Sequence, residues 1–144
     1  MPSGKVKHHF KTTPILSTYL IGLAIGEFDC LSETVKNSDG SDILVEVYAP
    51  IGNKKFMDLP FKLAKEHMAE LINSYGKFPI EKVAHVAIPD FRSGAMENNG
   101  IITYRESMFL VDESTDLLTL NYTSYVIAHE LTHAYFGNLV TMVI

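Results

Sequence analysis

The residues that most constrain this chain of 144 residues are His129 and His133, which lie four apart in a long apolar segment. The segment begins near Leu117, contains no proline, and has its first glycine at Gly137. This composition predicts a helix of roughly five turns or more, on which residues four apart share one face. Apolar residues nearly surround the two histidines and the glutamate between them, so the helix is expected to be buried.

The two histidines, with Glu130 directly after the first, have the spacing of a helical zinc site. Two imidazoles on one helix face can bind one Zn²⁺, and Glu130 then lies beside the metal, in the position of a general base. Buried ionisable side chains need partners, and a divalent cation provides one directly. The same five-residue pattern also occurs in proteins that bind no metal, so on its own it leaves both interpretations open.

A second group of residues with useful chemistry lies upstream, between strand-like segments at 83–88 and 101–104. Gly94 and Ala95 are small enough to let a substrate backbone approach closely, and Glu97 offers a carboxylate at a strand edge. Considered alone, these residues also fit a solvated loop that contains an acid.

Together, Gly94–Asn98 (GAMEN) and His129–His133 (HELTH) resemble the motifs of the M1 family of zinc aminopeptidases. The resemblance extends through nearly the whole chain, including Tyr104–Glu106 (YRE) between the motifs and Phe136–Met142 (FGNLVTM) after them. Gly94-Ala95 is more similar to the aminopeptidases than to the related epoxide hydrolase branch, which usually has a pair of glycines there.

The resemblance implies a Zn²⁺-dependent aminopeptidase that removes N-terminal residues from peptides with a free N-terminus. It implies that His129 and His133 are zinc ligands and that Glu130 is the general base. Glu97 would bind the α-amine of the substrate, which fixes the first peptide bond at the metal. The residues that would line the first subsites are Gly94, Ala95, Met96 and Asn98.

The chain also departs from the family pattern. In the family, a glutamate that acts as the third zinc ligand and an oxyanion-stabilising tyrosine lie at positions past Ile144, so the third ligand is expected to be missing from this chain. Asn99 replaces a tryptophan and Ala134-Tyr135 replace Gln-Trp, and both changes are expected to affect substrate fit. The alternative function is therefore a catalytically incompetent fragment with at most weak peptide or metal binding.

The pattern of apolar residues predicts an α+β fold. Segments 15–28 and 43–48 have the composition of strands, and Pro60 opens an amphipathic helix over 61–74. A small, mostly antiparallel sheet with GAMEN at its edge is expected to pack on the histidine-bearing helix. His67 and His85 are interpreted as packed or solvated side chains and not as ligands.

By resemblance, residues 14–144 form the N-terminal half of a thermolysin-like (gluzincin) catalytic domain, and residues 1–13 are the remnant of a preceding β domain. The remaining half of the catalytic domain is expected in a full-length relative. Without that half, the sheet and the zinc-motif helix should present an exposed apolar face.

Composition argues against several other functions. The net charge of −5 gives no basic surface for nucleic acid and weakly favours cationic ligands such as peptide amines. The longest apolar stretch, 19–25, is too short to span a membrane. Cys30 is the single cysteine, so an internal disulfide is excluded, and the localisation is left open with a lean toward the cytoplasm.

Overall fold

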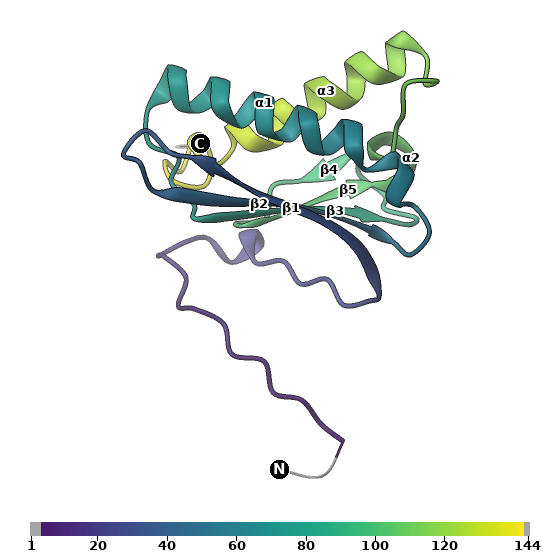
Figure 1. Ribbon diagram of the computed structural model, residues 1–144. Coiled ribbons are helices and arrows are strands. Elements are labelled where there is room, and N and C mark those ends of the chain that lie inside the picture. The colour runs from purple at the N-terminus through teal and green to yellow at the C-terminus, as the bar shows by residue number, and fades with distance from the viewer. Residues whose placement is uncertain (1–3, 143–144) are drawn as a thin grey trace.

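Five strands form one sheet in the computed structural model, which describes residues 4–142 (Figure 1). The strands are β1 (Phe28–Lys36), β2 (Asp42–Pro50), β3 (Lys82–Ile88), β4 (Ala95–Met96) and β5 (Ile101–Arg105). The helices are α1 (Asp58–Tyr75), α2 (Glu106–Phe109) and α3 (Leu117–Thr132), with 3-10 turns η1 (Thr18–Leu20) and η2 (Lys54–Phe56). Both long helices, α1 and α3, lie on one face of the sheet, and the segment before β1 runs below the other face (Figure 1).

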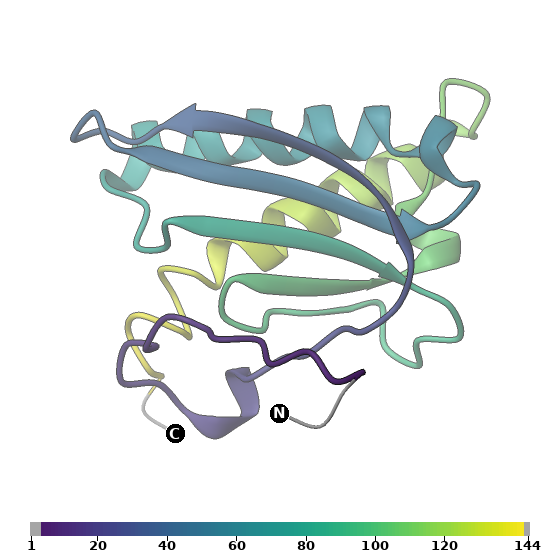
Figure 2. The same cartoon turned by 60° about the horizontal axis from the view of Figure 1, so that its bottom comes forward.

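The strand order is β1-β2-β3-β5-β4, which Figure 2 shows from the face opposite to the helices. The two outer pairings, β1 with β2 and β4 with β5, are antiparallel, as expected from the sequence. The two central pairings are parallel: α1 returns the chain between β2 and β3, and the segment that contains β4 returns it between β3 and β5. The α+β class is therefore confirmed, with a mixed sheet that is antiparallel at its outer pairings and parallel at its centre.

The core lies between β2 and α1. Val45 and Val47 alternate with outward-facing residues on β2, and they belong to the same buried cluster as Ala64 and Met68 of α1. The helix predicted over 61–74 is confirmed and extends slightly beyond both predicted ends. This core fixes the sheet relative to the helix layer, and so fixes the edge at which β4 lies.

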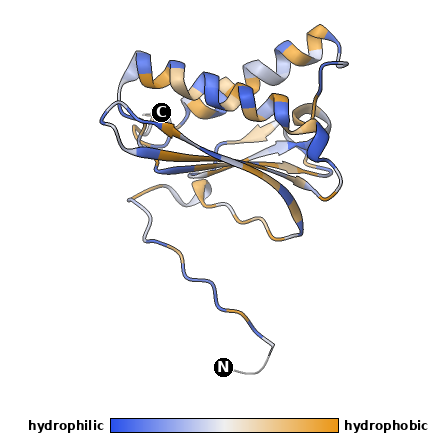
Figure 3. Cartoon of the chain, viewed as in Figure 1, coloured by the Kyte–Doolittle hydropathy of each residue, from blue (hydrophilic) through white to orange (hydrophobic). Residues whose placement is uncertain are grey.

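The strand predicted over 15–28 is wrong except for its last residue. This segment is irregular around η1, and Figure 3 shows apolar residues along it. Its alternating apolar side chains, including Ile21, Leu23 and Ile25, are exposed. It passes close to the β4–β5 turn, where Asn99 N donates to Leu20 O at 2.8 Å. The alternating apolar residues resemble the pattern of a strand, but among the described residues no neighbouring strand pairs with this segment.

The expected β-domain remnant begins in residues 1–3, which lie outside the described residues, and its residues 5–13 form neither helix nor strand. In the part of the chain that the structure describes, no helix has both the length and the apolar character needed to cross a membrane.

Candidate metal centre

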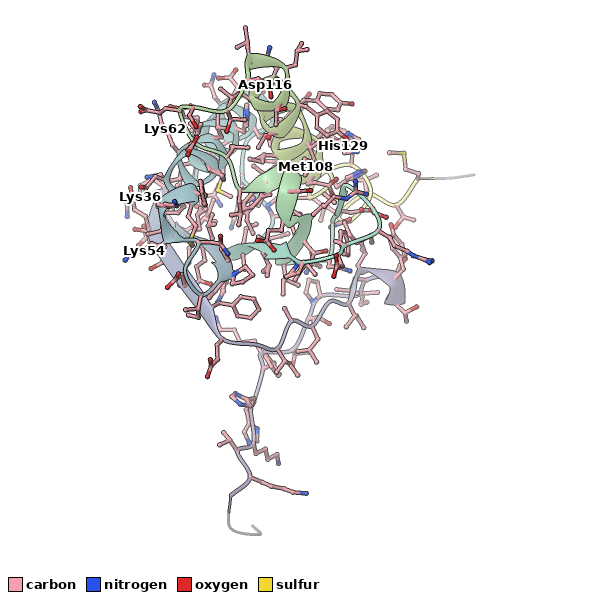
Figure 4. The ribbon with its side chains drawn as sticks, turned by 90° about the vertical axis from the view of Figure 1, so that its right-hand side faces the viewer. Lys36, Lys54, Lys62, Met108, Asp116 and His129 are labelled. Carbon is pink, nitrogen blue, oxygen red and sulfur yellow. The ribbon has the colours of Figure 1, made fainter. Side chains whose placement is uncertain are left out.

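The helix that carries the histidines, α3, has a well-defined start. The carboxylate of Asp116 accepts hydrogen bonds from Leu118 N at 3.1 Å and Thr119 N at 3.0 Å, so it caps the helix. Figure 4 labels Asp116 at this end and His129 further along the helix. The helix ends at Thr132, so it is somewhat shorter than predicted, and His133 is its C-cap.

One side of α3 is buried, whereas the sequence suggested that apolar residues would enclose it. Ile127 and Leu131 are fully buried, but Tyr122, Tyr125 and His129 face solvent. The expected exposed apolar face is therefore present on this helix. It also leaves the imidazole of His129 accessible to a metal ion.

The two histidines bring their ring nitrogens together. Nε2 of His129 lies 3.1 Å from Nε2 of His133, and the two rings are nearly perpendicular at 86°. Two nitrogens bound to one tetrahedral Zn²⁺ at the usual bond length would lie about 3.3 Å apart. The pair therefore has a separation close to that of two zinc ligands.

The other ring nitrogen of His133 fixes which tautomer is present. Nδ1 of His133 lies 3.1 Å from the carbonyl oxygen of Phe136, which can only accept a hydrogen bond. The proton is therefore on Nδ1, and Nε2 presents its lone pair toward His129. A metal-binding histidine is commonly oriented by such a hydrogen bond from its second nitrogen.

Two carboxylates lie close to His133, in a group of possible ligands that does not include His129. Glu97, Glu130 and His133 each offer a ligand atom, and these atoms all lie within 4.8 Å of one another. Glu97 comes from the sheet edge directly after β4, and Glu130 comes from α3. The structure thus brings together residues from the two motifs that the sequence analysis selected separately.

Glu130 is buried, with 7% of its surface exposed, and its Oε2 has no hydrogen-bond partner among the described residues. Burial, followed by the negative charge of Glu97, raises the pKa of Glu130 to about 7, while His133 acts in the opposite direction. A carboxylate with a pKa near neutrality can accept and release a proton under ordinary conditions.

The predicted subsite residues lie along β4 and the turn after it. Ala95 pairs with Tyr104 and Met96 with Thr103, so one side of β4 is used by β5 and the other side is the sheet edge. Gly94 precedes this strand and its carbonyl accepts from Arg105 N at 2.8 Å.

Asn98, the last residue of the first motif, has a structural contact. It is buried, and its Nδ2 donates to the carbonyl oxygen of Tyr19 at 3.2 Å. The side chain therefore also holds the segment before β1 against the β4–β5 turn.

The other two histidines of the core region are packed, as the sequence suggested. His85 is fully buried and its Nδ1 lies 2.9 Å from the hydroxyl of Tyr104, and His67 lies 2.9 Å from the hydroxyl of Ser124. Neither belongs to the cluster of Glu97, Glu130 and His133.

The sequence motifs do not indicate one further residue that lies near the site. Asn138 lies in the turn after α3, and its Nδ2 donates to the backbone oxygen of Glu97 at 3.0 Å. The signal available in the sequence was its place in the FGNLVTM segment, where Gly137-Asn138 suggests only a turn.

Comparisons with known proteins identify the family of this chain. Residues 59–144 match the model of the peptidase family M1 domain. The chain is 41% identical over 138 residues to aminopeptidase N of Lactobacillus helveticus, covering 94% of this chain and 16% of that protein. It is 39% identical over 153 residues to endoplasmic reticulum aminopeptidase 2 of Bos taurus, covering 99% of this chain and 15% of that protein.

The chain thus spans about a sixth of the length of the relatives that it matches. The family match covers more than half of its residues and includes both the sheet edge with Glu97 and the helix with His129 and His133. On this basis the chain belongs to peptidase family M1, and is by family a peptidase.

Proposed function

We propose that residues 14–144 are the N-terminal part of a thermolysin-like catalytic domain of a zinc-dependent aminopeptidase, and that residues 1–13 are the end of a preceding β domain. The observation that carries the proposal is the 3.1 Å separation of the Nε2 atoms of His129 and His133. The relatives at about 40% identity are named aminopeptidases, which supports peptides with a free N-terminus as the substrates.

The donor set fits Zn²⁺. Imidazole nitrogens are good zinc ligands, and the tautomer of His133 leaves Nε2 free to bind. When bound, zinc would polarise the scissile carbonyl and lower the pKa of a water molecule. His129 and His133 alone leave part of a tetrahedral coordination shell to other ligands, so binding by these two residues is expected to be weak.

Glu130 would move the proton. Its carboxylate is one residue from His129 along the helix and lies beside His133, so it is placed to take a proton from the attacking water and return it to the leaving amine. Its buried position keeps bulk water from competing for that proton.

Glu97 would bind the α-ammonium of the substrate. Its carboxylate lies within 4.8 Å of ligand atoms of both Glu130 and His133, so an ammonium paired with it would place the first peptide bond beside the metal. The free edge of β4, with Gly94, Ala95, Met96 and Asn98 along or beside it, would line the first subsites.

A second candidate is a fragment with at most weak peptide or metal binding and no turnover. The exposed apolar residues Leu118, Tyr122 and Tyr125 on α3 favour it, because an apolar helix face normally packs against further structure.

Calorimetric titration with Zn²⁺ tests the metal site. The parent chain should bind one Zn²⁺ weakly, and binding should be lost in His129→Ala and in His133→Ala. His67→Ala is the control, because it removes an imidazole outside the cluster. Equal binding by all four proteins would refute the ligand assignment. Chelator-sensitive release of N-terminal residues from peptides by the parent would separate the enzyme from the fragment.

A further inference from the structure

The chain reverses direction directly after α3, and the residues of this turn contact both halves of the proposed site. Gly137 has a φ of 128°, and Asn138 N donates to the carbonyl oxygen of His133 at 3.0 Å. Gly137 N in turn donates to Val140 O at 2.9 Å, which closes the turn. The turn is therefore built by hydrogen bonds on both sides of Asn138.

On the helix side, the turn orients a proposed metal ligand. The carbonyl of Phe136 lies 3.1 Å from Nδ1 of His133. On the sheet side, Nδ2 of Asn138 donates to the backbone oxygen of Glu97 at 3.0 Å, across 41 residues of sequence. The same short segment thus contacts His133 and Glu97.

We propose that Asn138 is a positioning residue that sets the spacing between the carboxylate of Glu97 and the imidazole of His133. The inference rests on the proposed function, in which Glu97 binds the substrate amine and His133 binds the metal. The hydrogen bond from the Asn138 amide would hold the amine-binding residue Glu97 at a fixed distance from the metal ligand His133. Loss of that amide should therefore affect amine binding while the histidine pair remains intact.

The Asn138 side chain also lines the same cavity as Glu130. Oδ1 of Asn138 and Oε2 of Glu130 are both buried without a hydrogen-bond partner among the described residues, and both side chains line the same cavity of about 10 Å³. A cavity of this size holds about one water molecule, which could donate to both oxygens. Asn138 would then also orient the general base.

A purely structural role for Asn138 can be tested against a matched residue. Asn53 is half-buried like Asn138, and its Nδ2 donates to the backbone oxygen of Pro50 at 3.1 Å. Neither Asn53 nor Pro50 belongs to the cluster of Glu97, Glu130 and His133 or lines the cavity that contains Glu130 and Asn138. Asn53→Ala should therefore destabilise the chain without altering the site.

The experiment compares the full chain with Asn138→Ala and Asn53→Ala in excess Zn²⁺, using NMR titrations with L-alaninamide and N-acetyl-L-alaninamide. The measured quantity is the ratio of the affinities for the free and the acetylated amine. Asn138→Ala should lower this ratio about fivefold or more, the value of one hydrogen bond, while the calorimetric Zn²⁺ affinity changes by less than about twofold. Asn53→Ala should lower the melting temperature and leave both quantities at parent values.

The outcomes separate the two proposals. If the parent binds Zn²⁺ but does not prefer the free amine, the amine role of Glu97 fails and the positioning role fails with it. If the parent prefers the free amine and Asn138→Ala keeps the full ratio, only the positioning role is overturned. Should Asn138→Ala not fold, Asn138→Leu retains about the same side-chain volume, removes the amide donor and adds no charge, and the same loss of the ratio is expected.

Discussion

The hydroxyl of Tyr104 lies 2.9 Å from Nδ1 of His85, and both side chains are fully buried in the sheet that supports the site. Burial lowers the pKa of His85 to about 3, so the folded protein keeps this imidazole neutral. The unfolded chain binds a proton below the ordinary pKa of 6.5. The contribution of His85 to stability is therefore complete above pH 6.5 and is lost as the pH falls toward 3.

Urea denaturation should detect this difference. Between about pH 7 and pH 5, protonation of unfolded His85 should remove on the order of 2 kcal/mol from the free energy of unfolding. The decrease should be clearly smaller in His85→Phe and should stay at the parent value in His67→Gln. Equal decreases in the parent and His85→Phe would mean that His85 titrates normally in the folded protein.

Gly137→Ala should weaken Zn²⁺ binding. A Cβ at this position would lie 3.2 Å from Nδ1 of His133, and the φ of 128° is unfavourable for alanine. We expect about a tenfold loss of Zn²⁺ affinity by calorimetry, because the imidazole is displaced. Gly40→Ala is the control: its φ is 83° but a Cβ there meets nothing within 4 Å, so stability should fall and Zn²⁺ affinity should not. A similar loss of affinity in both variants would attribute the effect to general destabilisation.

Glu130→Gln should separate metal binding from proton transfer. The amide keeps the size of the side chain but cannot accept the proton, so the Zn²⁺ stoichiometry should be unchanged. In an active peptidase that carries this site, kcat should fall by about two decades or more with little change in peptide affinity. Steady-state kinetics with a peptide substrate measures both quantities. Unchanged turnover would exclude Glu130 as the general base.

Glu97→Ala should change how substrates are positioned. Without the carboxylate, KM should rise and kcat should fall together for peptides with a free amine, because both depend on the ion pair that places the first peptide bond. In the same active peptidase, N-acetylated peptides should be poor substrates of parent and variant alike. Efficient internal cleavage of an N-acetylated peptide would indicate an endopeptidase.

The sequence correctly predicted the helix and the strand in which the spacing of apolar residues equals the spacing of buried residues. The helix over 61–74 could be predicted because its inward residues recur at the helical period. The strand over 43–48 could be predicted because its apolar residues alternate, as the buried residues of a strand do. Segment 15–28 was misread because its apolar residues also alternate, although they are exposed in the structure. The polar strand β1, by contrast, has few apolar residues to mark it.

Within the site, the spacing of residues along the sequence predicts which side chains meet only when both lie on the same helix. The separation of His129 and His133 follows from the helical period, so their meeting could be predicted directly. The approach of Glu97 to His133 depends on the sheet edge and the turn after α3, and it was inferred from family resemblance alone. Asn138 was missed because its partner is 41 residues away in the sequence.

The shortness of β4 has a consequence for how peptides of different length should behave. With only Ala95 and Met96 in the strand, an extended peptide along this edge can form very few backbone hydrogen bonds, each contributing about 1 kcal/mol. Residues beyond the first few of a peptide therefore gain nothing from β4 itself. Affinity at this edge should depend on the terminal residue and level off quickly with chain length, so dipeptides and long peptides would compete there on nearly equal terms.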